Sequence, residues 1–107
     1  MTWTDLHHRT EIVHTVLARA AIDPNDPALF AGIADLDRLF GGVEGLLQAL
    51  ANRWDNHLHV KLELAEIDGL TPMEAYLELA AEQPGLRALL DARRAIGQTT
   101  RDRALAR

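Results

Sequence analysis

Apolar residues along the chain recur at helical spacing in several segments, and no stretch of useful length alternates as a strand would. The first segment is expected to end at Asp23–Pro24, because a residue before proline disfavours helical geometry. Thr2 or Thr4 is expected to cap its start. The apolar stripe of this segment consists of Trp3, Leu6, Val13, Val16, Leu17 and Ala20.

A short second helix is predicted from about Pro27 to Phe40, with Asp26 as its cap and Gly41–Gly42 as its end. The longest helix follows over about Val43 to Ile67 and carries two apolar stripes. The first contains Val43, Leu47, Leu50, Trp54, Leu58, Leu62 and Ala65; the second, offset stripe contains Val60, Leu64 and Ile67. A helix that is apolar on two sides is typical of a central position or of an interface.

The residues Thr71–Glu74 form a capping box with proline at the first helical position, and they predict a helix to about Glu82. Its inward face is expected to be Met73, Tyr76, Leu77 and Ala80. After a break at Pro84–Gly85, a last helix is predicted from about Leu86 to Ile96, with Leu89, Leu90 and Ile96 as its apolar face. Residues 97–107 are then a candidate for a flexible basic tail.

These segments predict an all-α fold: a small bundle of about five helices with one long central helix, forming a single domain over residues 1–107. The apolar fraction of 48% is ordinary for a globular protein, and the aromatic fraction of 5% leaves a core of mainly aliphatic side chains.

Composition removes several classes of chemistry. The chain has no cysteine and no serine, which excludes disulfides, thiolate zinc sites and serine or cysteine nucleophiles. No glycine-rich phosphate loop is present. We therefore expect no enzyme, no catalytic residue and no cofactor. The chain also lacks a signal-peptide pattern or an apolar run long enough to span a bilayer, so the expected location is the cytoplasm and no membrane partner is expected.

The net charge of −5 is distributed unevenly. Residues 87–107 contain six arginines and two aspartates, whereas residues 1–86 contain five lysines or arginines and fourteen acidic residues. An acidic body repels nucleic acid and a basic end attracts it; a solvated, frayed end is the simpler interpretation.

Five histidines suggest a metal site. His7, Glu11 and His14 share one face of the first helix and are candidate ligands for zinc or iron, with a polar helix flank as the alternative. In the long helix, Asp55 and His59 are spaced to form a surface ion pair, and His57 lies at the edge of the apolar stripe, where it would line a cavity.

The segment from Ala31 to Leu47, AGIADLDRLFGGVEGLL, resembles the end of the helix-turn-helix in the tetracycline-repressor-like (TetR-like) family of bacterial regulators. Ala31–Ile33 matches the glycine-containing turn, Leu39–Gly41 the aromatic closure, and Glu44 to Leu47 the start of the long connecting helix. The resemblance extends in matching order from about Arg9 to Ala92. It implies a helical regulator that reads DNA through Ile33, Asp35 and Arg38.

Compared with that family, the chain is about half as long, lacks the helices that form the usual dimer interface, and has a shortened, acidic reading stretch. The leading hypothesis is therefore a non-enzymatic binding module. Its partner is a protein, a second copy of the chain or a small apolar ligand, bound through Leu47, Leu50, Trp54, His57, Leu58 and Leu62. A DNA-binding transcriptional regulator is the alternative, and a metal-dependent enzyme the remote one.

Overall fold

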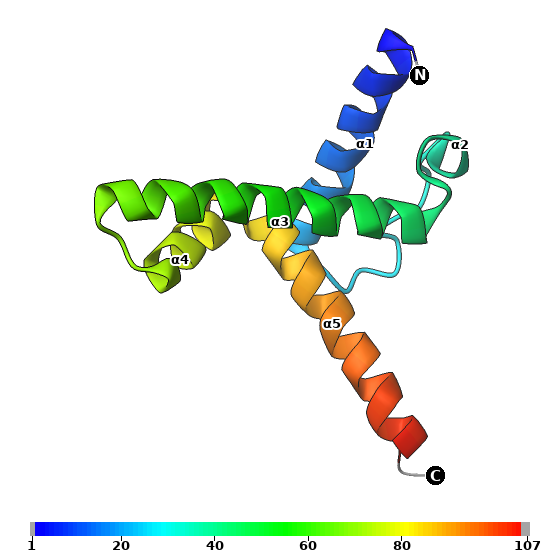
Figure 1. Ribbon diagram of the computed structural model, residues 1–107. Coiled ribbons are helices and arrows are strands. Elements are labelled where there is room, and N and C mark those ends of the chain that lie inside the picture. Colours follow the sequence, from blue (N-terminus) through cyan, green and yellow to red (C-terminus); the bar gives the residue numbers. More distant parts are fainter. Residues whose placement is uncertain (1, 106–107) are drawn as a thin grey trace.

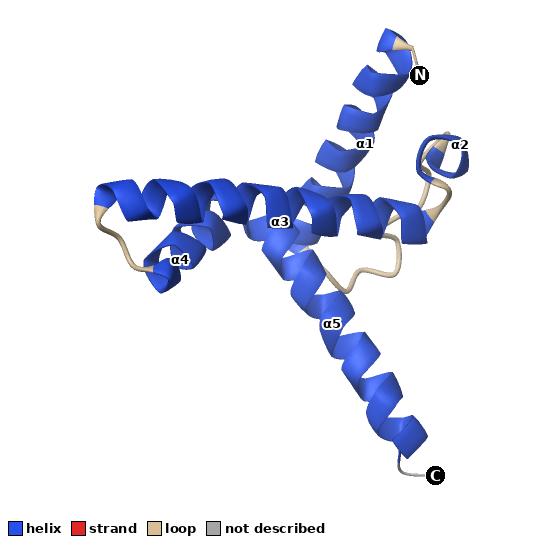
Figure 2. Cartoon of the chain, viewed as in Figure 1, coloured by secondary structure: helices blue, strands red, loops and turns tan. Residues whose placement is uncertain are grey.

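A computed structural model describes residues 2–105; within residues 97–103 it describes the backbone only. All regular elements in this part of the chain are helices, which confirms the predicted all-α bundle of five (Figure 2). They are α1 (Trp3–Ile22), α2 (Leu36–Phe40), α3 (Val43–Asp68), α4 (Pro72–Glu82) and α5 (Pro84–Leu105).

The long helix α3 is the centre of the arrangement (Figure 1). α4 folds back along the second half of α3, while α1 and α5 cross α3 near its middle and project to opposite sides. The radius of gyration is 16.0 Å, whereas a compact domain of this length has about 13 Å. The molecule is therefore open, and the N-terminal end of α1 and the second half of α5 extend away from the body.

Local signals set most helix ends. The Thr2 hydroxyl accepts a hydrogen bond of 3.1 Å from the Asp5 amide at the start of α1. The Thr71 hydroxyl accepts one of 3.1 Å from the Glu74 amide, and Pro72 occupies the first position of α4, as the capping box predicts. Gly41 and Gly42 both have positive φ angles, of 77° and 98°, which L-residues rarely adopt, so α2 ends there.

The second predicted helix is wrong over most of its length, because only Leu36–Phe40 is helical and residues 24–35 form turns. The Arg19 guanidinium donates to the carbonyl groups of Leu29 (3.2 Å) and Ala31 (2.8 Å), which a helix would pair with its own amides. Asp35 has φ 64°, a left-handed conformation that interrupts a helix. Leu29 is nevertheless 1% exposed and anchors the turns to the core.

The last helix also differs from its prediction. It begins at Pro84 rather than Leu86 and continues beyond Ile96 to Leu105. The predicted tail over residues 97–107 thus falls partly on helix; the side chains of residues 97–103 and the whole of residues 106–107 lie outside the described part of the chain.

One apolar cluster joins α1, α3, α4, α5 and the turn before α2. Its buried members are Ile12, Val16, Ala20, Leu29, Leu46, Leu50, Trp54, Leu79, Leu86 and Leu89. The Trp54 ring meets the Tyr76 ring edge-on at a centroid distance of 5.7 Å, and the Arg87 guanidinium lies 4.5 Å from the centre of the Trp54 ring. Trp54 is thus a core residue that ties α3 to α4 and α5.

Several residues expected to face inward are exposed. Trp3 (81%) and Leu6 (50%) lie on the projecting part of α1, beyond the reach of α5. On α4, Met73 and Leu77 are exposed, and the buried face is formed by Ala75 and Leu79 instead. Ile96 is exposed because α5 has left the core by that point. In each case the apolar residue is at helical spacing, but at least half of its surface stays exposed.

Candidate functional site

The α3–α4 end of the molecule has the most exposed apolar surface on α3. Val60 (53% exposed), Leu64 (50%) and Ile67 (80%) form the offset stripe of α3 on one face of the helix. Two of them line a groove of about 310 Å³ between α3 and α4. Its walls are His57, Val60, Lys61, Leu64, Leu79, Glu82 and Gln83. His57 therefore does line a hollow, and its Nδ1 lies 3.5 Å from Gln83 Nε2.

The rim of this groove is charged. The Lys61 ammonium is 2.7 Å from Glu82 and 3.2 Å from Glu78, so it bridges α3 to α4. The hydrogen bond to Glu82 raises the pKa of Lys61, with a smaller contribution from Glu78. Within residues 60–83 this lysine is the one basic residue against six acidic ones. The groove therefore combines apolar walls with a negative surrounding field.

The interface predicted from the first stripe of α3 is mostly covered by the chain itself. Leu50 and Trp54 are buried in the core, and the remaining members, Leu47, His57, Leu58 and Leu62, are half-buried. The expectation that α3 is apolar on two sides is confirmed, but the stripe that remains open is the offset one. Because Trp54 packs against Tyr76 of α4 and Arg87 of α5, part of the first stripe belongs to the core. An interface through the half-buried members of that stripe stays a prediction.

The predicted DNA-reading residues lie at the α2 end. Ile33 is half-buried, whereas Asp35 and Arg38 are exposed. The Arg38 guanidinium is 3.0 Å from Asp5 and 3.3 Å from Asp35, and His8 lies 3.8 Å from Asp35. Two carboxylates thus surround the one arginine of this stretch and oppose a phosphate contact. DNA binding through these residues stays a prediction.

This acidic pair supplies a pH-dependent prediction. The hydrogen bond from Arg38 holds the pKa of both Asp5 and Asp35 below 3.8. A carboxyl group whose pKa is lower in the folded protein than in the unfolded chain stabilises the fold at pH values above its unfolded-state pKa. This stabilisation is lost as the pH falls through the folded-state pKa. We expect carbon-detected NMR titration to find both pKa values below 3.8 in the wild type and raised in Arg38→Gln. Unchanged values in the variant would show that other groups cause the shift.

The candidate metal ligands do not converge. His7 Nε2 lies 3.6 Å from Glu11 Oε1, and both side chains are about two-thirds exposed. No group of three histidine, aspartate or glutamate side chains placed to hold a metal occurs in the described residues. In the second cluster, His59 lies 3.1 Å from Glu63 rather than beside Asp55. Both carboxylates are one helical turn from His59, so spacing alone did not distinguish them.

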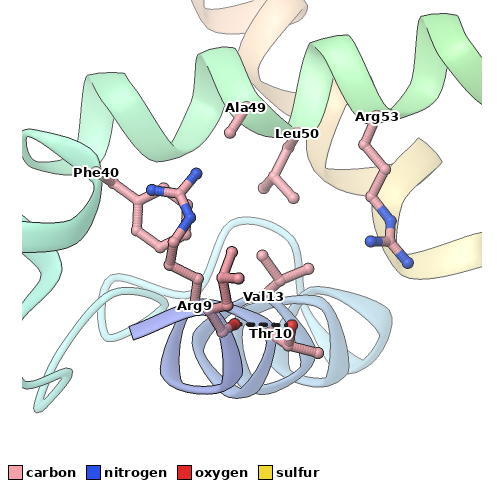
Figure 3. Close-up of a pocket in the computed structure, with 8 residues that line it drawn as sticks. Arg9, Thr10, Val13, Phe40, Ala49, Leu50 and Arg53 are labelled. Carbon is pink, nitrogen blue, oxygen red and sulfur yellow. Dashed lines mark hydrogen bonds between the residues drawn. The ribbon is translucent and has the colours of Figure 1, made fainter. Parts of the chain in front are cut away.

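A second hollow, between α1 and α3, was not predicted from the sequence. It has a volume of about 220 Å³, and Arg9 and Arg53 are among its lining residues (Figure 3). The arginines lie forty-four positions apart in the chain, so only the crossing of the two helices brings them to one site; no local spacing signal indicates it.

No helix in the described part of the chain is both long and apolar enough to cross a membrane. No protein-family model matches the chain, and no match was found among curated proteins or solved structures.

Proposed function

We propose that the chain is a non-enzymatic helical binding module that self-associates through the α3–α4 groove. The observation that carries this proposal is the exposure of Val60, Leu64 and Ile67 on one face of a helix that is otherwise part of the core. Exposed apolar stripes rimmed by polar residues mark interaction sites. The open shape of the molecule adds to this, since its apolar groups are left less covered than in a compact domain.

The charge pattern selects the partner. The groove and its surroundings, residues 60–83, are strongly acidic, so they favour a helix that carries basic and apolar side chains. The projecting half of α5 has this character: residues 93–105 contain four arginines and one aspartate. Exposed apolar residues, Ile96 and Leu105, lie on the same segment. A second copy of the chain therefore supplies a complementary helix, and reciprocal insertion of α5 closes a two-fold dimer.

The order of α2, the Gly41–Gly42 turn and α3 agrees with the expected order of the tetracycline-repressor-like segment. Common descent with the tetracycline-repressor-like family is therefore a proposal about the origin of the fold and not about its activity. The groove, rather than the DNA-reading stretch, supports the activity proposed here, because its apolar surface is open and the charge of Arg38 is already paired.

The test is the oligomeric state of Leu64→Asp. We expect light scattering at about 100 μM and low salt to find a wild-type dimer and a monomeric variant, since a carboxylate in an apolar, acidic groove is strongly disfavoured. The dimer should weaken at about 0.5 M salt, because screening reduces the attraction between α5 and the groove.

Leu77→Asp is the matched control, since Leu77 is 57% exposed on α4 but does not line the groove. It should leave the dimer intact. A wild type that stays monomeric at about 100 μM, or a control that dissociates as completely as Leu64→Asp, would contradict the proposed interface.

A further inference from the structure

The hollow between α1 and α3 has an unusual lining for an acidic protein. Its floor and walls are mostly apolar, and its charged residues are both arginines. The lining consists of Leu6, Arg9, Thr10, Val13, Phe40, Ala49, Leu50 and Arg53. No carboxylate lines it, although the chain carries sixteen acidic residues and a net charge of −5. The local field in the hollow is therefore opposite in sign to that of the whole molecule.

The two arginines differ in what they already bind. Arg9 donates a hydrogen bond to the Leu39 carbonyl, and its guanidinium lies 4.2 Å from the centre of the Phe40 ring. Figure 3 shows this stack at one side of the hollow. Arg9 thus closes that side and contributes charge, while its hydrogen-bonding capacity is partly used.

Arg53 lies at the other side of the hollow and extends from α3 toward the level of α1 (Figure 3). Its Nε is buried and has no hydrogen-bond partner among the described residues. Solvent does not reach this atom, so the donors that remain for a ligand are the terminal Nη groups of Arg53, which form no hydrogen bond or ion pair with the described residues. The planar guanidinium fork binds a carboxylate through two parallel hydrogen bonds.

We propose that this hollow binds a small monocarboxylate with a compact apolar body. The carboxylate pairs with Arg53, and the body lies against Val13, Phe40 and Leu50. A volume of about 220 Å³ is below the usual range of about 300 to 1,000 Å³ for drug-sized ligands, which limits the body to about one ring or a short branched chain. This ligand site is separate from the α3–α4 groove, and it goes beyond the proposed self-association.

The first test is an NMR titration of the wild type with phenylacetate, its neutral counterpart phenylacetamide, and acetate. We expect phenylacetate to bind with a Kd of about 0.1 to 5 mM, as suits a ligand of this size. Phenylacetamide lacks the charge and acetate lacks the apolar body, so each should bind at least about tenfold more weakly. Absence of phenylacetate binding at 20 mM (about four times the weakest expected Kd), or equal binding of the amide, overturns the proposal.

Two variants locate the site. Arg53→Gln removes the fork and should weaken phenylacetate binding at least about tenfold, and Ala49→Phe, which fills the hollow, should do the same without altering charge. Arg94→Gln removes an equal charge from an exposed position on α5. Because Arg94 belongs to the segment proposed to dimerise, this control is measured in the monomeric Leu64→Asp background, where it should leave the Kd for phenylacetate unchanged. Far-ultraviolet circular dichroism checks that each variant is folded. Unchanged affinity in Arg53→Gln or in folded Ala49→Phe overturns the assignment.

The same titration in the Leu64→Asp background separates the two proposals. Leu64 does not line this hollow, so a monomeric variant should bind phenylacetate as the wild type does. Loss of dimerisation without loss of phenylacetate binding supports the ligand site independently of the groove. Loss of phenylacetate binding in this folded variant would overturn a site formed by α1 and α3 of one chain.

Discussion

Replacing Leu89 by alanine is expected to lower the free energy of unfolding by about 2 to 5 kcal/mol. Leu89 is fully buried on α5 within the apolar cluster. The substitution removes apolar contacts and leaves a cavity that the surrounding helices fill only in part. A domain of this size has a total stability of about 5 to 15 kcal/mol, so the loss is a large fraction of it. The Tm should fall by at least about 8 °C.

Thermal unfolding followed by circular dichroism at low protein concentration measures this effect without a contribution from association. Leu77→Ala is the matched control: it is the same chemical change at a position that is 57% exposed on α4. Its effect should stay within about 0.5 kcal/mol. Equal destabilisation by the two variants would contradict the assignment of Leu89 to the core and of Leu77 to the surface.

The second large effect is expected at Gly85, where alanine should destabilise the protein by about 1 to 3 kcal/mol or more. A Cβ built on Gly85 would lie well under 3.0 Å from the carbonyl oxygen of Leu17, and 3.4 Å from the Cβ of Ala21. The obstruction is backbone of α1 and has no rotamer to change. α1 and α5 would therefore have to separate at the place where they cross.

Destabilisation by Gly85→Ala would be direct evidence for the close contact between α1 and α5, because the usual effect of this substitution in a helix has the opposite sign. Glycine to alanine within a helix ordinarily stabilises by about 0.5 to 1 kcal/mol, because alanine has less backbone entropy to lose. Pro84→Ala introduces the same residue at the exposed neighbouring position and serves as the control. Urea unfolding should find Gly85→Ala less stable than both the control and the wild type. A Gly85→Ala protein as stable as the wild type would show that α1 and α5 are not in close contact here.

At Gly85 the sequence predicted the break between two helices but not the close contact with α1. Pro84–Gly85 predicts a break between two helices, and Gln83 alone separates α4 from α5. The reason that glycine is needed at position 85, however, is the approach of Leu17 from α1. No pattern near residue 85 carries that information, because the contact joins segments that are far apart in the chain.

The sequence by itself determined the features that depend on nearest neighbours. These are the helical periodicity, the all-α class, the length of α3 to within a residue, and the cap at Thr71 with Pro72 at the first position of α4. Each follows from backbone hydrogen bonding and φ preferences within a few residues. The two apolar faces of α3 were predicted for the same reason.

Tertiary structure alone decided which apolar face is covered and which residues meet. The segment before α2 forms turns in place of the expected helix, and Arg19 of α1 donates hydrogen bonds to its Leu29 and Ala31 carbonyls. The packing of α4 and α5 covered Trp54, and Leu50 is buried where α3 crosses α1, while Val60 and Leu64 stay open. The same crossing of α1 and α3 brought Arg9 and Arg53 to one hollow. Periodicity places a side chain on a face of its helix, but burial and charge pairing depend on the other helices that pack against that face.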